Sequence, residues 1–77
     1  MNEWARMEKM ADIYKKQYPK GTRIELISMA DDYAVAPGTK GTVRCVDDVG
    51  TIHIQWDNGR TLGLIPGEDS FRVIEEV

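Results

Sequence analysis

The chain has little of what several classes of functional site require. It contains one cysteine, Cys45, which excludes an internal disulfide and a zinc site with four cysteine ligands. It contains one histidine, His53, and neither an EF-hand pattern nor a glycine-rich phosphate loop. No run approaches the about 18 apolar residues of a membrane span, and the N-terminus carries no apolar leader segment. We therefore expect a domain of the cytoplasm, without a metal or cofactor.

Basic residues are scarce in the larger part of the chain. The 77 residues carry a net charge of −3, with five bases against three acids in residues 1–20 and five bases against ten acids in residues 21–77. A nucleic-acid-binding surface normally has a basic stripe, because neutralising phosphates supplies much of its affinity. The charge distribution therefore disfavours nucleic acid as a partner.

Residues 51–65 carry the strongest structural pattern, a β-hairpin. Two alternating apolar runs flank a turn at residues 57–59. A three-residue loop pairs Ile54 with Leu62 and gathers the large apolar side chains on one face, whereas a two-residue loop would divide them between both faces. The pattern therefore predicts a type I turn followed by Gly59 in the left-handed conformation of a G1 bulge.

The N-terminal residues predict an amphipathic helix that ends before Pro19. Its apolar stripe needs a surface, because an isolated helix of this length is marginal in water. We expect the helix to fold back over one open end of the β region, with Trp4 or Tyr14 closing that end. The alternative is a homodimer in which Trp4, Met7 and Tyr14 form the association surface. The whole stripe consists of Trp4, Met7, Ala11, Tyr14 and Tyr18.

Short apolar runs separated by turn residues predict a mostly β fold. We expect one domain, with an N-terminal α-helix at residues 1–18 and a five-stranded SH3-like β-barrel at residues 19–77. Alternation predicts that Cys45 faces inward and Val46 outward. The expected strands are residues 22–29, 41–47, 51–56, 60–65 and 70–74.

Several segments carry a family resemblance, among them Gly-Thr-Arg-Ile-Glu-Leu (21–26), Pro-Gly-Thr-Lys-Gly-Thr-Val (37–43) and Trp-Asp-Asn-Gly-Arg (56–60). Over residues 18–74 the chain resembles a domain-of-unknown-function family of small SH3-like barrels from Gram-positive bacteria, their phages and mobile elements. This resemblance implies a fold but no activity. The chain is more distantly similar to KOW and Mind-bomb-type barrels, which bind RNA or peptides, so the resemblance implies a nucleic-acid-binding barrel as an alternative.

The candidate catalytic residues do not form a recognisable motif. His53 lies on the polar face of its predicted strand and has no serine or cysteine partner at a meaningful spacing. Cys45 is expected to be buried and therefore inert. The acidic pairs lie in predicted turns, where aspartate is favoured because it bonds its own backbone. We therefore expect no enzyme activity.

Binding of a protein or peptide is the function that the sequence favours. If the loop between the first two strands lies near the hairpin, aromatic side chains flank a groove with an acidic rim at Asp31 and Asp32, which suits a basic or proline-containing peptide. Such a site requires an exposed Trp56. The alternative is that Trp56 fills the barrel mouth and Tyr33 fixes the loop. The predicted binding residues are Tyr33, Pro37, Trp56, Asp57 and Arg60.

Overall fold

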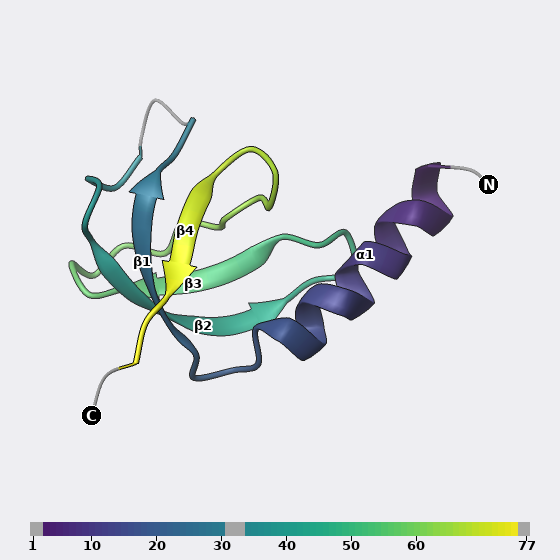
Figure 1. Ribbon diagram of the computed structural model, residues 1–77, viewed down its shortest axis with the longest axis horizontal. Coiled ribbons are helices and arrows are strands. Elements are labelled where there is room, and N and C mark those ends of the chain that lie inside the picture. The colour runs from purple at the N-terminus through teal and green to yellow at the C-terminus, as the bar shows by residue number, and fades with distance from the viewer. Residues whose placement is uncertain (1–2, 31–33, 76–77) are drawn as a thin grey trace.

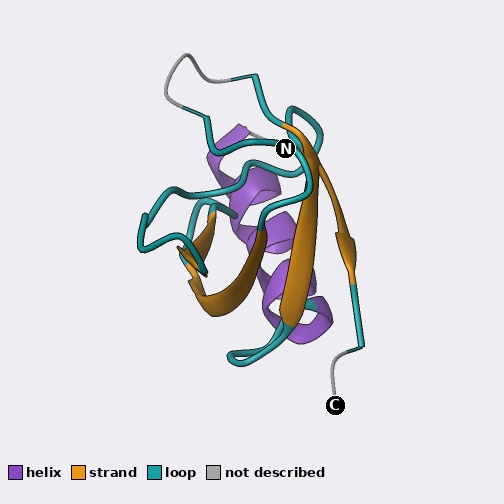
Figure 2. Cartoon of the chain, turned by 90° about the vertical axis from the view of Figure 1, so that its left-hand side faces the viewer, coloured by secondary structure: helices purple, strands orange, loops and turns teal. Residues whose placement is uncertain are grey.

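The computed structural model describes residues 3–30 and 34–75, with side chains from Ala5 onward, and shows one helix beside one curved sheet (Figure 1). The sheet is antiparallel, in the order β3-β2-β1-β4. In Figure 1, β1 and β4 run across the direction of β2 and β3, and Figure 2 shows the resulting curl of the sheet. The elements are α1 (Glu3–Gln17), β1 (Arg23–Ser28), β2 (Lys40–Val46), β3 (Ile52–Trp56) and β4 (Ser70–Val73).

The mostly β fold is confirmed, but the expected closed barrel of five strands is not. In the described part of the chain the sheet is open and has four strands. Residues 60–65, expected as a strand, contribute only isolated bridges. One reason is that the carbonyl of Leu62 accepts a hydrogen bond from Nε1 of Trp56 at 2.9 Å. The next residue, Gly63, has no side chain to pack and weakens a strand further.

The predicted register of the hairpin at residues 51–65 is confirmed. Ile52 and Leu64 exchange two backbone hydrogen bonds, of 2.9 and 2.8 Å, and the amide of Trp56 donates to the carbonyl of Arg60 at 2.9 Å. Gly59 closes the three-residue loop with a φ of +92°. The choice between registers therefore follows from burial, since this pairing keeps all the large apolar side chains on one face.

The core lies on one face of the sheet, and Trp56 is its largest buried side chain, with 1% of its surface exposed. Gly41 lies opposite Trp56 on the neighbouring strand. A Cβ on Gly41 would come within 2.5 Å of Cγ2 of Ile54 and 3.0 Å of Cε3 of Trp56. The buried cluster consists of Ile24, Leu26, Val35, Val43, Val46, Ile52, Ile54, Trp56 and Leu64.

A β-bulge reverses two predicted orientations in β2. Cys45 was expected to face inward and is exposed, whereas Val46 was expected to face outward and is only 8% exposed. The register shifts between Val43 and Cys45, so Arg44 is the extra residue. Because a bulge adds one residue to one strand, the alternation of side chains changes phase after it.

Among the side chains described from Ala5 onward, helix α1 packs on the β region through its second half. Ala11 is 1% exposed, and Tyr14 and Tyr18 pack against the core cluster. Residues 5–10 are all exposed, and in Figure 1 this half of the helix extends beyond the sheet. The helix therefore contacts the β region through Ala11 and Tyr14, whereas closure of one open end by Trp4 or Tyr14 stays a prediction. Among the described residues, no helix combines the length and apolar character needed to cross a bilayer.

Candidate functional site

An open groove of about 770 Å³ lies on the outer face of β2 and β3, opposite the core. It extends to the segment that joins α1 to β1. Its lining combines three basic groups, two hydrogen-bonding side chains and one thiol. These side chains belong to Lys20, Arg44, His53, Thr42, Gln55 and Cys45.

Two pairs of opposed residues form the floor of the groove. Thr42 lies opposite Gln55, and Cys45 lies opposite His53. The bulge at Arg44 brings Cys45 onto this face, since without it the thiol would point into the core. Bulges are common beside functional sites, where they redirect a side chain.

The segment before β1 supplies the remaining cation, Lys20. Backbone hydrogen bonds fix this segment along β2: the amide of Gly21 donates to the carbonyl of Val43, and the amide of Val43 donates to the carbonyl of Thr22, both at 2.9 Å. The end of the helix at Gln17 and the turn after it therefore position Lys20 beside the groove.

The charge of the groove is opposite to that of the whole chain. Lys20 and Arg44 carry positive charges in its lining, and no carboxylate lines it within the described part of the chain. The protein nevertheless carries a net charge of −3. A cationic concave surface on an acidic protein concentrates positive potential in one place, which attracts anionic ligands.

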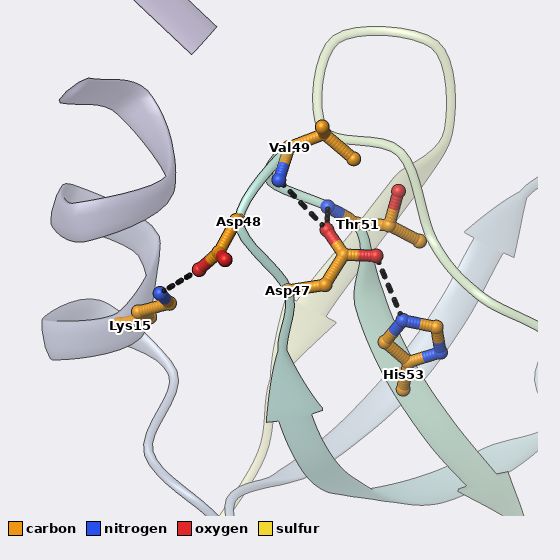
Figure 3. A network of polar contacts seen from close by, with 6 residues as sticks. All are labelled: Lys15, Asp47, Asp48, Val49, Thr51 and His53. Carbon is orange, nitrogen blue, oxygen red and sulfur yellow. Dashed lines mark hydrogen bonds and ion pairs between the residues drawn. The ribbon is translucent and has the colours of Figure 1, made fainter. Parts of the chain in front are cut away.

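Asp47 lies at the end of β2 and holds both the following turn and the ring of His53 (Figure 3). Its Oδ1 accepts hydrogen bonds from the amides of Val49 at 3.1 Å and Thr51 at 2.9 Å. Its Oδ2 lies 2.9 Å from Nε2 of His53. Burial tends to raise the pKa of Asp47, but the hydrogen bonds from His53, Thr51 and Val49 outweigh it and lower the pKa.

The same turn is attached to the helix. Asp48 accepts a hydrogen bond from Nζ of Lys15 at 2.8 Å, as Figure 3 shows. This hydrogen bond raises the pKa of Lys15. An exposed ion pair of this kind contributes little to stability, because water and salt screen it.

In the structure Cys45 lies opposite His53, and His53 contacts Asp47, although the sequence suggested no cysteine partner for the histidine. They are the types found in cysteine-nucleophile sites, in which a histidine activates the thiol. In the described residues, however, no hydrogen bond joins the thiol of Cys45 to the ring of His53. No group of three or more potential metal ligands occurs in that part of the chain either.

The aromatic residues of the predicted peptide site do not form an exposed platform in the described structure. Trp56 is 1% exposed and fills the core, which is the alternative that the sequence left open. Tyr33 lies outside the described residues, as do Asp31 and Asp32. Pro37 is exposed and does not line the groove on β2 and β3.

The two charged residues of the predicted site have partners within the protein. Asp57 accepts hydrogen bonds from both terminal nitrogens of Arg23, at 2.8 and 2.6 Å, and this contact lowers the pKa of Asp57. Nη1 of Arg60 donates to the carbonyl of Ala34 at 3.2 Å. Neither residue lines the groove, and a binding role for them stays a prediction.

Association through the helix also stays a prediction. Met7 is 36% exposed, Tyr14 packs partly against the core, and the side chain of Trp4 lies outside the described part. Tyr14 is therefore only partly available to a second chain.

Sequence reasoning missed Lys20, Arg44 and Cys45 as groove residues. A pattern in the sequence could have located the bulge. The inward residues of β3, Ile52 and Ile54, are two positions apart, whereas the valines that face them, at 46 and 43, are three apart. Pairing both valines with both isoleucines requires one extra residue between the valines.

The comparison with known families identifies one match. A family described as a domain of unknown function, DUF4314, matches residues 7–74. No curated protein matches the chain. The matched region includes most of the helix, all four strands and the whole groove. The chain therefore belongs to the DUF4314 family.

Proposed function

We propose that this protein is a non-enzymatic interaction module that binds an acidic, extended segment of a partner protein in the groove on β2 and β3. The observation that carries the proposal is the clustering of Lys20, Arg44 and His53 in one concave surface of an acidic protein. Cationic side chains bind carboxylates through charge-assisted hydrogen bonds. Thr42 and Gln55 add hydrogen-bonding groups between them.

The shape and lining of the groove favour a peptide over a nucleic acid. Single-stranded nucleic acids are bound by stacking their bases on aromatic side chains, and no aromatic residue of the described part lines this groove. A KOW-like nucleic-acid-binding function is therefore the alternative that the experiment below must test.

The absence of a catalytic step is part of the proposal. An activated cysteine nucleophile needs a hydrogen bond to its base and a site that excludes water. The groove is open, and Cys45 does not bond His53 within the described residues. We therefore assign the histidine to ligand binding.

We also propose that the module acts in the cytoplasm of a Gram-positive bacterium, or is encoded by one of its phages or mobile elements. The family resemblance supports the source, and the exposed thiol of Cys45 suits a reducing compartment. The resemblance to SH3-like barrels stays a prediction, and binding in the groove does not depend on it.

Calorimetry with a hexa-aspartate peptide, capped at both ends, tests the proposed function. Charge reversal in the groove, by Arg44→Glu or Lys20→Glu, should weaken binding about tenfold or more, since one charge-assisted hydrogen bond is worth about 1.5–3 kcal/mol. Lys9→Glu makes the same charge change on the exposed face of α1, outside the groove, and should change affinity much less.

Two outcomes would contradict the proposal. One is equal weakening by Lys9→Glu and Arg44→Glu, which would mean that the peptide responds only to overall charge. The other is tighter binding of a twelve-nucleotide oligothymidine than of hexa-aspartate at physiological salt, which would favour the nucleic-acid alternative.

A further inference from the structure

The only histidine of the chain stands at the groove with one ring nitrogen already engaged. Nε2 of His53 lies 2.9 Å from Oδ2 of Asp47, and Figure 3 shows the second ring nitrogen, Nδ1, pointing away from Asp47. Within the described part of the chain Nδ1 has no hydrogen-bond partner. Nδ1 is therefore the ring atom that remains for a ligand.

Asp47 determines which nitrogen carries the proton in the neutral ring. Its carboxylate is held in place by the amides of Val49 and Thr51, which both donate to Oδ1. An ionised carboxylate can only accept hydrogen bonds, so Nε2 of His53 must be the donor across the 2.9 Å contact. The neutral ring consequently has its hydrogen on Nε2 and a lone pair on Nδ1.

This tautomer cannot bind a carboxylate through Nδ1. A lone pair repels a carboxylate oxygen, whereas a protonated ring presents an N–H and a positive charge to it. The carboxylate of Asp47 stabilises the protonated ring from the other side. The groove therefore changes from a hydrogen-bond acceptor to a cationic donor at this position when the ring takes up a proton.

We propose that the groove binds its acidic ligand together with one proton, which is taken up at Nδ1 of His53. This inference rests on the proposed function, and it adds that the site responds to pH. In the free protein the nearby cations Lys20 and Arg44 oppose a further positive charge, and Asp47 favours it. The remaining titratable neighbour is the thiol of Cys45, opposite His53. A bound carboxylate offsets the repulsion from these cations and therefore favours the protonated ring of His53.

The expected consequence is an affinity that rises as the pH falls. Histidine changes its charge within the physiological range, whereas aspartate peptides stay ionised above about pH 5. Binding linked to one proton can strengthen by at most about tenfold per pH unit. For hexa-aspartate we expect a Kd at pH 6 that is about three- to tenfold lower than at pH 8.

Proton NMR provides a readout that does not depend on affinity. Because the chain has one histidine, its ring signals are unambiguous. Saturating hexa-aspartate should move the midpoint of their titration to higher pH. His53→Gln, which cannot take up a proton, should give the same Kd at pH 6 and pH 8. Asp47→Asn keeps an oxygen for the amides of Val49 and Thr51 but no longer requires Nε2 of His53 to be the donor, and should reduce the difference between the Kd values at pH 6 and pH 8.

The outcomes separate this inference from the proposed function. If the wild-type protein binds hexa-aspartate equally well at pH 6 and pH 8, or if His53→Gln keeps the pH dependence, proton uptake at His53 is wrong while peptide binding stands. If the histidine midpoint does not move on binding, the inference is also wrong. If no binding occurs at either pH, both the proposed function and this inference fail.

Discussion

The inward and outward side chains of β2 and β3 belong to the same two strands and have opposite properties. On the inner face Gly41, Ile54 and Trp56 fit so closely that one additional methyl group would overlap with its neighbours. On the outer face the side chains are largely exposed and carry the charges of the groove. These outward residues are Thr42, Arg44, Cys45, His53 and Gln55.

This difference shows how a small domain separates stability from recognition. The inner face contributes to the stability of the fold through buried apolar area and close packing, which any change of side-chain volume disturbs. The outer face contributes to ligand binding through charges and hydrogen-bonding groups, which solvent screens until a ligand covers them. Substitutions on the inner face should therefore reduce stability, and substitutions on the outer face should mainly alter binding and its pH dependence.

The largest effect is expected for Trp56→Ala on the inner face. Removing a buried tryptophan costs about 3–5 kcal/mol, and the carbonyl of Leu62 also loses its hydrogen bond from Nε1. Since a domain of this size has a small margin, the variant should be largely unfolded, which urea denaturation followed by circular dichroism can measure. Trp56→Phe retains a ring and should remain folded. A stable Trp56→Ala variant would show that the ring is not the centre of the core.

A smaller loss, of about 2 kcal/mol or more, is expected for Gly41→Ala, because its Cβ would lie 2.5 Å from Ile54 and 3.0 Å from Trp56. Gly41 does not have a positive φ, so crowding alone causes this loss. The urea midpoint measures it. The double variant Gly41→Ala/Ile54→Val removes a methyl group at the contact. A smaller loss of stability in this variant than in Gly41→Ala would support crowding as the cause. An unchanged midpoint for Gly41→Ala would contradict the close fit of the inner face.

Gly59→Ala should cost about 1 kcal/mol for a different reason. Its φ is +92°, and a Cβ there would have no neighbour within 4 Å, so the loss comes from backbone conformation and not from packing. Thermal melting should show a lower Tm. Asparagine tolerates the left-handed region better than alanine, so Gly59→Asn should lower the Tm less than Gly59→Ala. Equal stabilities of the three proteins would disprove the turn conformation on which the hairpin register depends.

The smallest effect on stability is expected for Asp47→Asn, at the edge of the outer face, and it should depend on pH. The folded protein lowers the pKa of Asp47, so the folded state binds its proton less tightly than the unfolded state. This contribution is therefore present above the ordinary aspartate pKa of about 3.9 and is lost as the pH falls below it, through the folded pKa. The urea midpoint of the wild type should fall from pH 6 to pH 3 by more than that of Asp47→Asn. Identical falls would show that the hydrogen bonds to Asp47 do not contribute to stability.

The hairpin at residues 51–65 and the helix show what could be predicted from the sequence. Their patterns are local: a residue that tolerates positive φ stands at the turn, and apolar residues recur at a fixed period. The register followed because one pairing buries all large apolar side chains and the other does not. Burial of Trp56 was left open, because the sequence places it at a strand end, where both core and surface positions occur.

The groove required information that no single segment contains. It depends on a bulge in β2, which can be recognised only by comparing β2 with β3 residue by residue. It also depends on Lys20, which is brought beside the groove by backbone hydrogen bonds between the neighbouring segment and Val43. The sequence also did not show that the indole of Trp56 donates to the carbonyl of Leu62, in the segment expected as a fifth strand.

By itself the sequence determined the helix, four of the five expected strands, the hairpin register and the apolar stripe of the helix, because each follows from periodicity and backbone preferences over a few neighbouring residues. Only the tertiary structure decided which residues of β2 face solvent, that Gly41 has no room for a side chain, and that Cys45, His53 and Asp47 meet at one cationic groove. The physical reason is that these features depend on the distances between strands, which are set by packing across the whole core.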